Sequence, residues 1–411
     1  MEHEQQHRVP VRRAVASTSA CATPVAPPVS AHRAPAVLAE PSRSLHHHRG
    51  DAAHPRRPGS LWEHVWSFEA LHAAYRRARR QKRYHAEVLH FSANLEGELL
   101  QLQNELIWKT YRTSPYRLFC VHDPKTRQIM APAFRDRVVH HALCAVLEPL
   151  AERRFIFDSY ACRIGKGTHA ALRRLQAFLR RATAHGHHAW VLKADVSRYF
   201  PSVPHQPLLT RWRRIVADDD VLWLVWEIIR SVGAPNTMGE MCGLPIGALT
   251  SQLSANVYLD PIDHAVKEVL REPWYLRYMD DMVIVGREKV TLRAGQRHLA
   301  ESLASAGLLL NPKTVILSAA VGVPFVGYRV WATHARVLQP TLRRMRRRLR
   351  ALREDAANGT CDLADVSRRV QSWVAHAAHA ESWRVRTALL NDVVFHGPSE
   401  ARGPATKGTA R

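Results

Sequence analysis

The chain has 411 residues, of which 46% are hydrophobic and 23% are charged, so it holds enough apolar material for a packed core and is not wholly disordered. Lys and Arg number 59 against 36 Asp and Glu, and a net charge of +23 favours a phosphate-rich partner over a merely solvated basic surface. The absence of a run of 18 apolar residues excludes a membrane-spanning helix, and the polar start lacks a secretory signal. The six cysteines form no C-x-x-C pair, so we expect neither a disulfide framework nor a cysteine-based zinc site, and a reducing cytoplasm fits.

The first 60 residues differ in composition from the rest of the chain. Ala, Pro, Ser, His and Arg dominate there, and such a segment cannot bury enough apolar area to offset its ordering entropy. We therefore predict a disordered tail, in which the cluster His46–His48 is incidental rather than a metal site. Order should begin at Leu61, and apolar spacing predicts a helix from Ser92 through Trp108.

From residue 119 to about 335, short strand-like runs alternate with helical ones, which indicates an α+β fold. The predicted elements are, in chain order, a strand Val191–Ala194 ending on Asp195, a helix end at Asp260–Leu270, a hairpin Tyr275–Val285, a helix Thr291–Ala306 and a strand Pro324–Val330. Beyond Pro340 the chain reads as helical and very basic, and from Gly397 as a frayed tail.

Tyr278-Met279-Asp280-Asp281 places two carboxylates in the tight turn of the apolar hairpin. Adjacent carboxylates repel one another unless they share a cation, and hard oxygen ligands suit Mg²⁺. The alternative is a solvated surface turn, because so short a motif also arises by chance.

Asp195 adds a carboxylate at the end of a separate strand. A two-metal site needs carboxylates from separate elements, which bridge two ions that lie about 4 Å apart and flank a reacting phosphate. Phe200, five residues further on, would lie under an incoming sugar, where a bulky ring excludes a 2′-hydroxyl. A core aromatic is the alternative for this residue.

These segments together resemble the reverse transcriptases over most of residues 110–335. The matching motifs are, in order, the first fingers motif Arg127–His140, the second fingers motif Phe155–Leu172, motif A at Asp195–Phe200, motif C at Tyr278–Asp281, motif D at Asn311–Thr314 and the primer grip at Val326–Tyr328. The resemblance implies a right-hand polymerase with fingers, a palm whose antiparallel sheet carries the YMDD hairpin, and a helical thumb.

The segment Gly243–Gln252 (GLPIGALTSQ) departs from the usual reverse transcriptase motif. Most members carry Gln-Gly and end in Ser-Pro, whereas this chain has Ile246-Gly247 and ends in Ser251-Gln252. That form is typical of diversity-generating retroelements, whose enzymes copy a template-repeat RNA with errors at adenines. The absence of endonuclease, RNase H and integrase signatures fits a compact polymerase of this class.

The resemblance also implies roles for single residues. Asp195, Asp280 and Asp281, with Val196 among the metal-binding residues, would hold two Mg²⁺ ions, with Mn²⁺ as an alternative. Lys313 would protonate the pyrophosphate leaving group. The remaining assignments are nucleotide contacts at Arg127, Arg135, Phe200, Ile246 and Gln252, and a template-backbone contact at Lys166. Guanidinium forks suit a triphosphate, and the alternative for each basic residue is a solvated charge.

The segment Thr341–Asp355 reads as a thumb helix. Its apolar residues Leu342, Met345, Leu349 and Leu352 recur at helical spacing, and arginines cover the rest. A merely solvated helix would include acids for pairing, but none precedes Glu354. We assign phosphate contacts to Arg343, Arg344, Arg347 and Arg350. His376 and His379, further on, are interpreted as surface or core residues.

We therefore expect a tail at 1–60, N-terminal helices and fingers at 61–190, a palm at 191–335 with an insertion at 205–245, a thumb at 336–396 and a frayed end at 397–411. Expected partners are template RNA, the cDNA/RNA heteroduplex, dNTPs and a small accessory variability protein, in a bacterial or phage-encoded cytoplasmic setting. The alternatives are another bacterial reverse transcriptase, of group II intron, retron or phage-defence type, and a non-catalytic RNA-binding scaffold.

Overall fold

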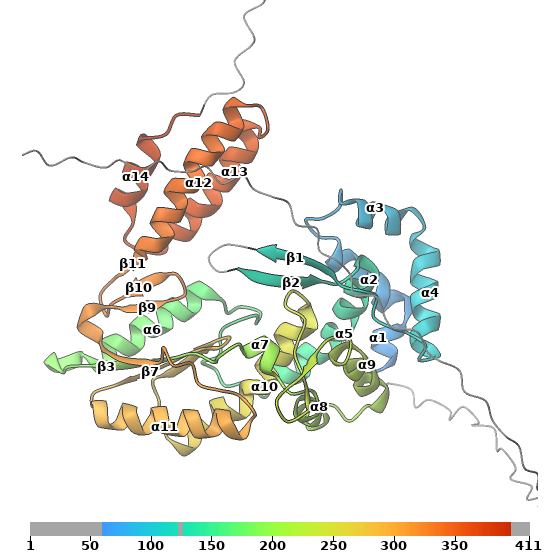
Figure 1. The fold of residues 1–411 in the computed structure, drawn as a ribbon, viewed down its shortest axis with the longest axis horizontal. Coiled ribbons are helices and arrows are strands. Elements are labelled where there is room, and N and C mark those ends of the chain that lie inside the picture. The colour runs from blue at the N-terminus through green and yellow to red at the C-terminus, as the bar shows by residue number, and fades with distance from the viewer. Residues whose placement is uncertain (1–59, 122–125, 396–411) are drawn as a thin grey trace, which may run out of the picture. The chain divides into compact units, whose positions relative to one another are not determined.

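The computed structural model describes residues 60–121 and 126–395, so the predicted tails lie outside it apart from Ser60. Within these residues, helices precede the first strand: α1 Glu63–Trp66, α2 Phe68–Ala78, α3 Ala86–Ala93 and α4 Leu95–Ile107 (Figure 1). The predicted helix from Ser92 through Trp108 is wrong at its start, because Asn94 has a non-helical backbone between α3 and α4. A Cβ at position 97 would lie only 2.6 Å from the Asn94 amide, so this break is packed against Gly97.

The fingers segment contains an antiparallel ribbon of two strands followed by two long helices. These elements are β1 Arg117–Val121, β2 Arg127–Ala131, α5 Phe134–Glu152 and α6 Thr168–Ala182. Every residue of β1 is exposed, whereas α5 buries most of one side against α2 and α10 (Leu249–His264).

A four-stranded antiparallel sheet in the order β6-β7-β3-β8 carries the predicted strand and hairpin. Its strands are β3 Trp190–Ala194, β6 Tyr275–Tyr278, β7 Asp281–Gly286 and β8 Val315–Ser318. Alternate residues of the strands point to opposite faces of the sheet, and each face belongs to a different core. On one face, Leu192 and Ile284 pack with α11 (Lys289–Ser305). On the other face, Val191 and Val283 pack with α6. Because both faces are covered, the strands read as continuous apolar runs rather than as alternating ones.

The remaining elements of this part of the chain lie between α6 and β6. They are the 3₁₀ turn η1 Ala184–Gly186, α7 Tyr199–Ser202, α8 His205–Arg213, α9 Asp219–Ile229, β4 Ala234–Pro235, β5 Met241–Cys242 and the π-helical turn η2 Ala265–Val269 that extends α10. The segment predicted as an insertion, 205–245, thus forms two helices and a small hairpin.

The C-terminal part begins with a three-stranded sheet and continues as three helices. Its elements are the 3₁₀ turn η3 Ala319–Val321, β9 Val323–Phe325, β10 Tyr328–Val330, β11 Ala335–Val337, α12 Gln339–Ala357, α13 Leu363–Ala377 and α14 Trp383–Asn391. The predicted strand Pro324–Val330 is instead two strands, because Val326 and Gly327 both adopt positive φ and turn the chain. In α12 the four predicted apolar residues are buried, as the spacing indicated.

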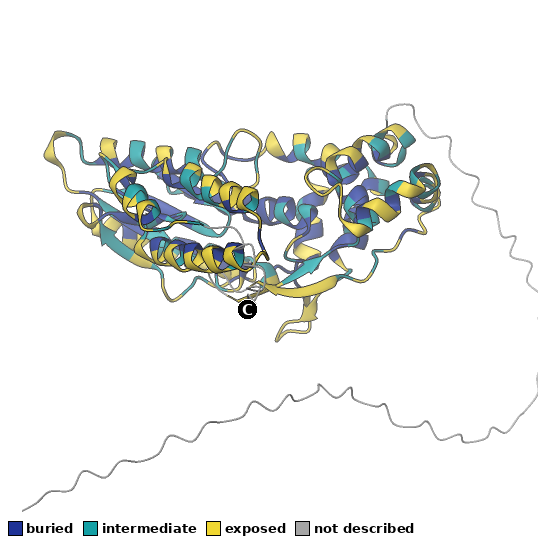
Figure 2. Ribbon diagram, turned by 90° about the horizontal axis from the view of Figure 1, so that it is seen from above, coloured by how far each residue is buried: buried dark blue, intermediate teal, exposed yellow. Residues whose placement is uncertain are grey.

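Burial follows the helical periodicity through the described residues. Figure 2 shows helices with buried residues along one side and exposed residues along the other. The five cysteines among the described residues are all unpaired. None of the described helices is both long enough and apolar enough to cross a membrane.

Candidate active site

The YMDD hairpin turns between β6 and β7 through just Met279 and Asp280, with Tyr278 paired to Asp281. Of the two turn residues only Met279 has a positive φ, at 57°. A side chain with a Cβ pays about 1–2 kcal/mol for this conformation, and glycine is the usual residue there. The turn is therefore strained at the residue next to the Asp280 carboxylate.

Asp195 follows β3 directly and lies beside this turn. Strand β3 is paired along its length with β7, so that its last residue, Ala194, is opposite Met282. Burial and the adjacent charge of Asp195 raise the pKa of Asp280 to about 6. Two carboxylates held this close destabilise each other's charge unless a cation lies between them.

Asp281 faces a different partner. Its Oδ1 accepts a hydrogen bond of 2.7 Å from Lys193 Nζ, and both side chains are partly exposed. Among the described residues no group of three metal-ligating side chains meets at one point. The structure thus brings together Asp195 and Asp280, and it does not gather all three predicted aspartates into one cluster.

Asn311 holds Asp195 on the side away from the turn. The backbone N–H of Asn311 donates to the Asp195 carbonyl at 2.7 Å, and its side-chain Nδ2 donates to Asp195 Oδ2 at 2.8 Å. The neighbouring bridge pairs Val196 with Leu310 through the backbone groups of Asp195 and Ser197. The Val196 carbonyl takes no part in this bridge.

These residues fit a divalent cation. Two carboxylates from separate strands, one with a raised pKa, and a nearby backbone carbonyl form an oxygen-only donor set of the kind that hard cations prefer. A divalent ion bound there would neutralise charge that develops on a reacting phosphate.

The other predicted nucleotide-binding residues lie on several elements. Phe200 packs partly buried beside Tyr199, and its carbonyl accepts the Leu244 N–H at 2.9 Å. Arg127 begins β2 and is exposed. Lys313 is exposed, and its backbone N–H donates to Asn311 Oδ1.

Two basic side chains that the sequence predicted to contact nucleotide or template, Arg135 and Lys166, instead contact other groups of the protein. Arg135 pairs with Glu105 at 2.5 Å, because an acidic side chain of α4 lies within its reach. Lys166 folds back onto its own loop, donating to the Phe157 carbonyl at 2.7 Å and lying 3.5 Å from the centre of the Phe157 ring. In this conformation neither side chain extends freely toward a nucleic acid. In α12, by contrast, Arg343, Arg347 and Arg350 are exposed, whereas Arg344 donates to Thr341.

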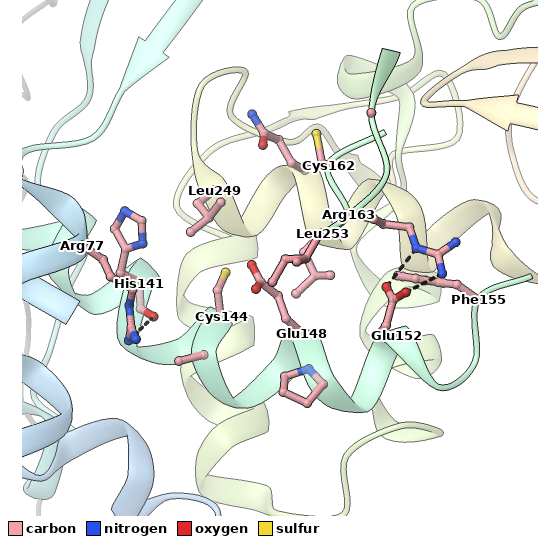
Figure 3. Close-up of a pocket in the computed structure, with 15 residues that line it drawn as sticks. Arg77, His141, Cys144, Glu148, Glu152, Phe155, Cys162, Arg163, Leu249 and Leu253 are labelled. Atoms are coloured by element: carbon pink, nitrogen blue, oxygen red, sulfur yellow. Dashed lines mark hydrogen bonds and ion pairs between the residues drawn. The ribbon is translucent and has the colours of Figure 1, made fainter. Parts of the chain in front are cut away.

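A cavity of about 810 Å³ lies where α5 approaches the start of α10. Gln252 lines this cavity. Cys144, Glu148 and Leu253, which are labelled in Figure 3, line it as well. Sequence reasoning assigned Gln252 a nucleotide contact and did not foresee the cavity, because the walls of the cavity come from segments about 100 residues apart.

Sequence reasoning also missed Lys193, Asn311 and Arg277 as residues that contact the site. A signal was present for each: Lys193 and Arg277 are charged residues inside apolar strands, and Asn311 lies within the segment matched to motif D. Their partners could not be read from one sequence, because each contact joins separate elements.

An antiparallel sheet with paired carboxylates at the ends of adjacent strands defines a template-directed nucleotidyltransferase. The model of the family described as reverse transcriptase (RNA-dependent DNA polymerase) matches residues 122–330. The chain belongs to this family and is an RNA-directed DNA polymerase by class, with a mixed helix and sheet fold of right-hand type. Members of the family generally use divalent metal ions.

Relatives include proteins of group II intron type. The chain is 29% identical to protein YkfC of Escherichia coli over 280 residues, which is 58% of this chain and 72% of YkfC. It is 24% identical to the group II intron-encoded protein LtrA of Lactococcus lactis over 165 residues, which is 39% of this chain and only 26% of LtrA. A telomerase structure from Candida albicans, in complex with a telomeric RNA fragment, aligns with a TM-score of 0.44 at 11% identity, over 69% of this chain and 56% of that one.

Proposed function

We propose that this chain is the reverse transcriptase of a diversity-generating retroelement, copying a template-repeat RNA into cDNA with errors concentrated at template adenines. Its substrates would be dNTPs, its cofactor two Mg²⁺ ions held by Asp195, Asp280 and Asp281, and its partners the template RNA and a small accessory variability protein. The observation that carries the proposal is Ile246, which stands where most of the family has glutamine.

The backbone around Ile246 is tied to both the fingers and motif A. The Ile246 carbonyl accepts the Met130 N–H of β2 at 2.9 Å, and Gly247, at φ 120°, approaches the same strand so closely that a Cβ would lie 3.2 Å from the Met130 carbonyl. On the other side, Leu244 donates to the Phe200 carbonyl at 2.9 Å. This loop therefore spans from the residue proposed under the incoming sugar to the fingers ribbon.

An apolar side chain at this place supports low fidelity. A polar wall discriminates strongly, because a displaced base leaves buried hydrogen-bonding groups unsatisfied, whereas an apolar wall tolerates displacement at a smaller cost. Isoleucine has no hydrogen-bonding group and is stiff at its branched Cβ. Alignment would loosen most in pairs with two hydrogen bonds, which include the pair of template adenine with thymine.

Ile246→Gln is expected to lower the misincorporation rate opposite template adenine and to change the rate opposite the other bases less. Because the loop is held through backbone groups, the substitution should leave its path intact. Deep sequencing of cDNA made on one RNA template by the wild type and the variant measures both rates. Ile107→Gln, at a half-buried position of α4, is the matched control and should leave the error spectrum unchanged.

Equal error spectra for the wild type and Ile246→Gln would contradict a causal role for Ile246. A uniformly accurate wild type would instead favour a reverse transcriptase of group II intron type, which the relatives YkfC and LtrA make the second candidate. The flanking DNA separates the two, because a diversity-generating element needs paired, near-identical repeats that differ at template adenines.

A further inference from the structure

Arg277 and Asp263 form an ion pair in which neither side chain has any exposed surface. Arg277 lies on β6, three residues before Asp280, and Asp263 lies near the end of α10. Arg277 Nε is 2.8 Å from Asp263 Oδ1, and Arg277 Nη2 is 2.6 Å from Asp263 Oδ2. Burying two charges is costly, so a fully buried pair is weak evidence for a stabilising role alone.

Every N–H group of the Arg277 guanidinium has a partner. A guanidinium carries five N–H donors in a rigid fork. Besides the carboxylate of Asp263, the acceptors are Asn256 Oδ1 and the Met279 carbonyl, each 2.9 Å from Nη1, and Ser159 Oγ, 3.4 Å from Nη2. The contact with Met279 is the one that reaches the active-site turn.

The two residues that hold Arg277 are themselves fixed. Asn256 Nδ2 donates to the Ala161 carbonyl at 2.9 Å, which directs its oxygen toward Arg277. Asp263 Oδ1 also accepts a hydrogen bond of 2.6 Å from Tyr275 Oη. Rotation of the guanidinium would therefore break several hydrogen bonds at once.

The backbone of Arg277 is fixed on the edge of the sheet as well. Its N–H donates to the Asp158 carbonyl and its carbonyl accepts the Tyr160 N–H, each at 2.9 Å. Arg277 thus connects the 158–160 segment, helix α10 and the turn that carries Asp280.

The strained turn explains why such a connection is needed. Met279 has its positive φ without being a glycine, so it gains by relaxing to a negative φ. Relaxation would rotate the Met279–Asp280 peptide and move the Asp280 carboxylate away from Asp195. The hydrogen bond from Arg277 Nη1 to the Met279 carbonyl opposes that rotation.

We propose that Arg277, held by Asp263 and Asn256, is a positioning residue that fixes the Met279–Asp280 peptide and thereby directs the Asp280 carboxylate toward Asp195. The proposal rests on the RNA-directed DNA polymerase activity and not on the retroelement type proposed above.

Arg277→Lys is the test variant, because a lysine ammonium keeps the charge opposite Asp263 but lacks the fork that also reaches Met279. We expect kcat for primer extension to fall by between about tenfold and 100-fold, because small misplacements of reacting groups have effects of this size. The KM for dNTP and the Kd for template–primer should stay within about twofold, because binding surfaces are unchanged. Mn²⁺ binding to the free protein, followed by electron paramagnetic resonance, should weaken by about tenfold.

A double variant separates positioning from general stability. Glycine adopts a positive φ without strain, so Arg277→Lys combined with Met279→Gly should recover part of the kcat that Arg277→Lys loses. If Arg277→Lys lowered kcat by destabilising the palm, the double variant would not recover it, because Met279→Gly adds no packing.

Arg163 offers a matched control (Figure 3). It pairs with Glu152 through two N–H groups, at 2.9 and 2.6 Å, and also donates to the carbonyls of Ile156 and Ser159, but it does not contact the turn. Arg163→Lys should lower the Tm with kcat changed by less than about twofold.

Retention of wild-type kcat by Arg277→Lys, an equal fall in kcat in Arg163→Lys, or no recovery in the double variant would each overturn the proposal. If Arg277→Lys does not fold, Asn256→Ala replaces it. That variant leaves the ion pair with Asp263 intact and removes one of the two hydrogen bonds that fix Nη1, the group that contacts Met279, so it should give a selective fall in kcat in the same direction.

Discussion

Asp280→Asn is expected to abolish nucleotide incorporation, lowering kcat by at least about a thousandfold, because metal-assisted charge stabilisation is worth several kcal/mol at about 1.4 kcal/mol per factor of ten. Asparagine keeps the size of the side chain and removes the negative charge that a divalent ion needs. Asp195→Asn should have an effect of the same order. Single-turnover primer extension at saturating divalent ion measures both.

The fold and the binding of template–primer should survive these two changes. Asp280 and Asp195 repel one another, and burial already raises the pKa of Asp280 to about 6, so removing one charge relieves unfavourable electrostatics. In the presence of EDTA, the Tm of Asp280→Asn should therefore equal or exceed that of the wild type.

Asp281→Asn and Asp219→Asn complete the series. The Asp281 variant should also be severe but less so, because Lys193 rather than Asp195 faces this carboxylate. Asp219 is exposed on α9, and its variant should keep full activity. Substantial extension by purified Asp280→Asn protein would rule out the carboxylate pair as the catalytic centre.

Replacing Arg343, Arg347 and Arg350 together with glutamine is expected to weaken RNA binding and to flatten its dependence on salt. For every phosphate that is no longer neutralised, the slope of log K against log salt should fall by about 0.9 on a duplex and about 0.7 on a single strand. All three residues are exposed on α12, whose buried residues are apolar, so the Tm should change little. Fluorescence anisotropy of a labelled template–primer at several salt concentrations gives the slope.

The control is a second triple replacement of equal charge. Arg271, Arg293 and Arg297 are also exposed. The latter two lie on α11, whose buried residues share a core with one face of the four-stranded sheet, whereas most of those of α12 belong to the core on the other face. Their replacement with glutamine should leave the slope nearly unchanged. Equal slopes for the wild type and the α12 variant would mean that this helix faces something other than nucleic acid.

Local patterns predicted the elements that carry the candidate site. The strand ending on Asp195, the hairpin around Asp280 and the apolar side of α12 are all present as the spacing indicated. These predictions succeeded because burial on both faces of a strand gives a continuous apolar run, and burial along one side of a helix gives a helical period. The sequence displays both patterns directly. The break at Asn94 and the turn at Val326 were missed, because each depends on one residue's backbone rather than on a period.

By itself the sequence determined that this protein is a basic α+β chain with three aspartates in the order of a reverse transcriptase. Tertiary structure decided which charges meet: Asp280 with Asp195, Asp281 with Lys193, Arg135 with Glu105 and Arg277 with Asp263. Hydrogen bonds and ion pairs act over a few ångströms between elements that are far apart in the chain, so the fold alone selects each partner. The strain at Met279 belongs with them, because a positive φ in a non-glycine residue persists only where surrounding contacts such as that of Arg277 hold it.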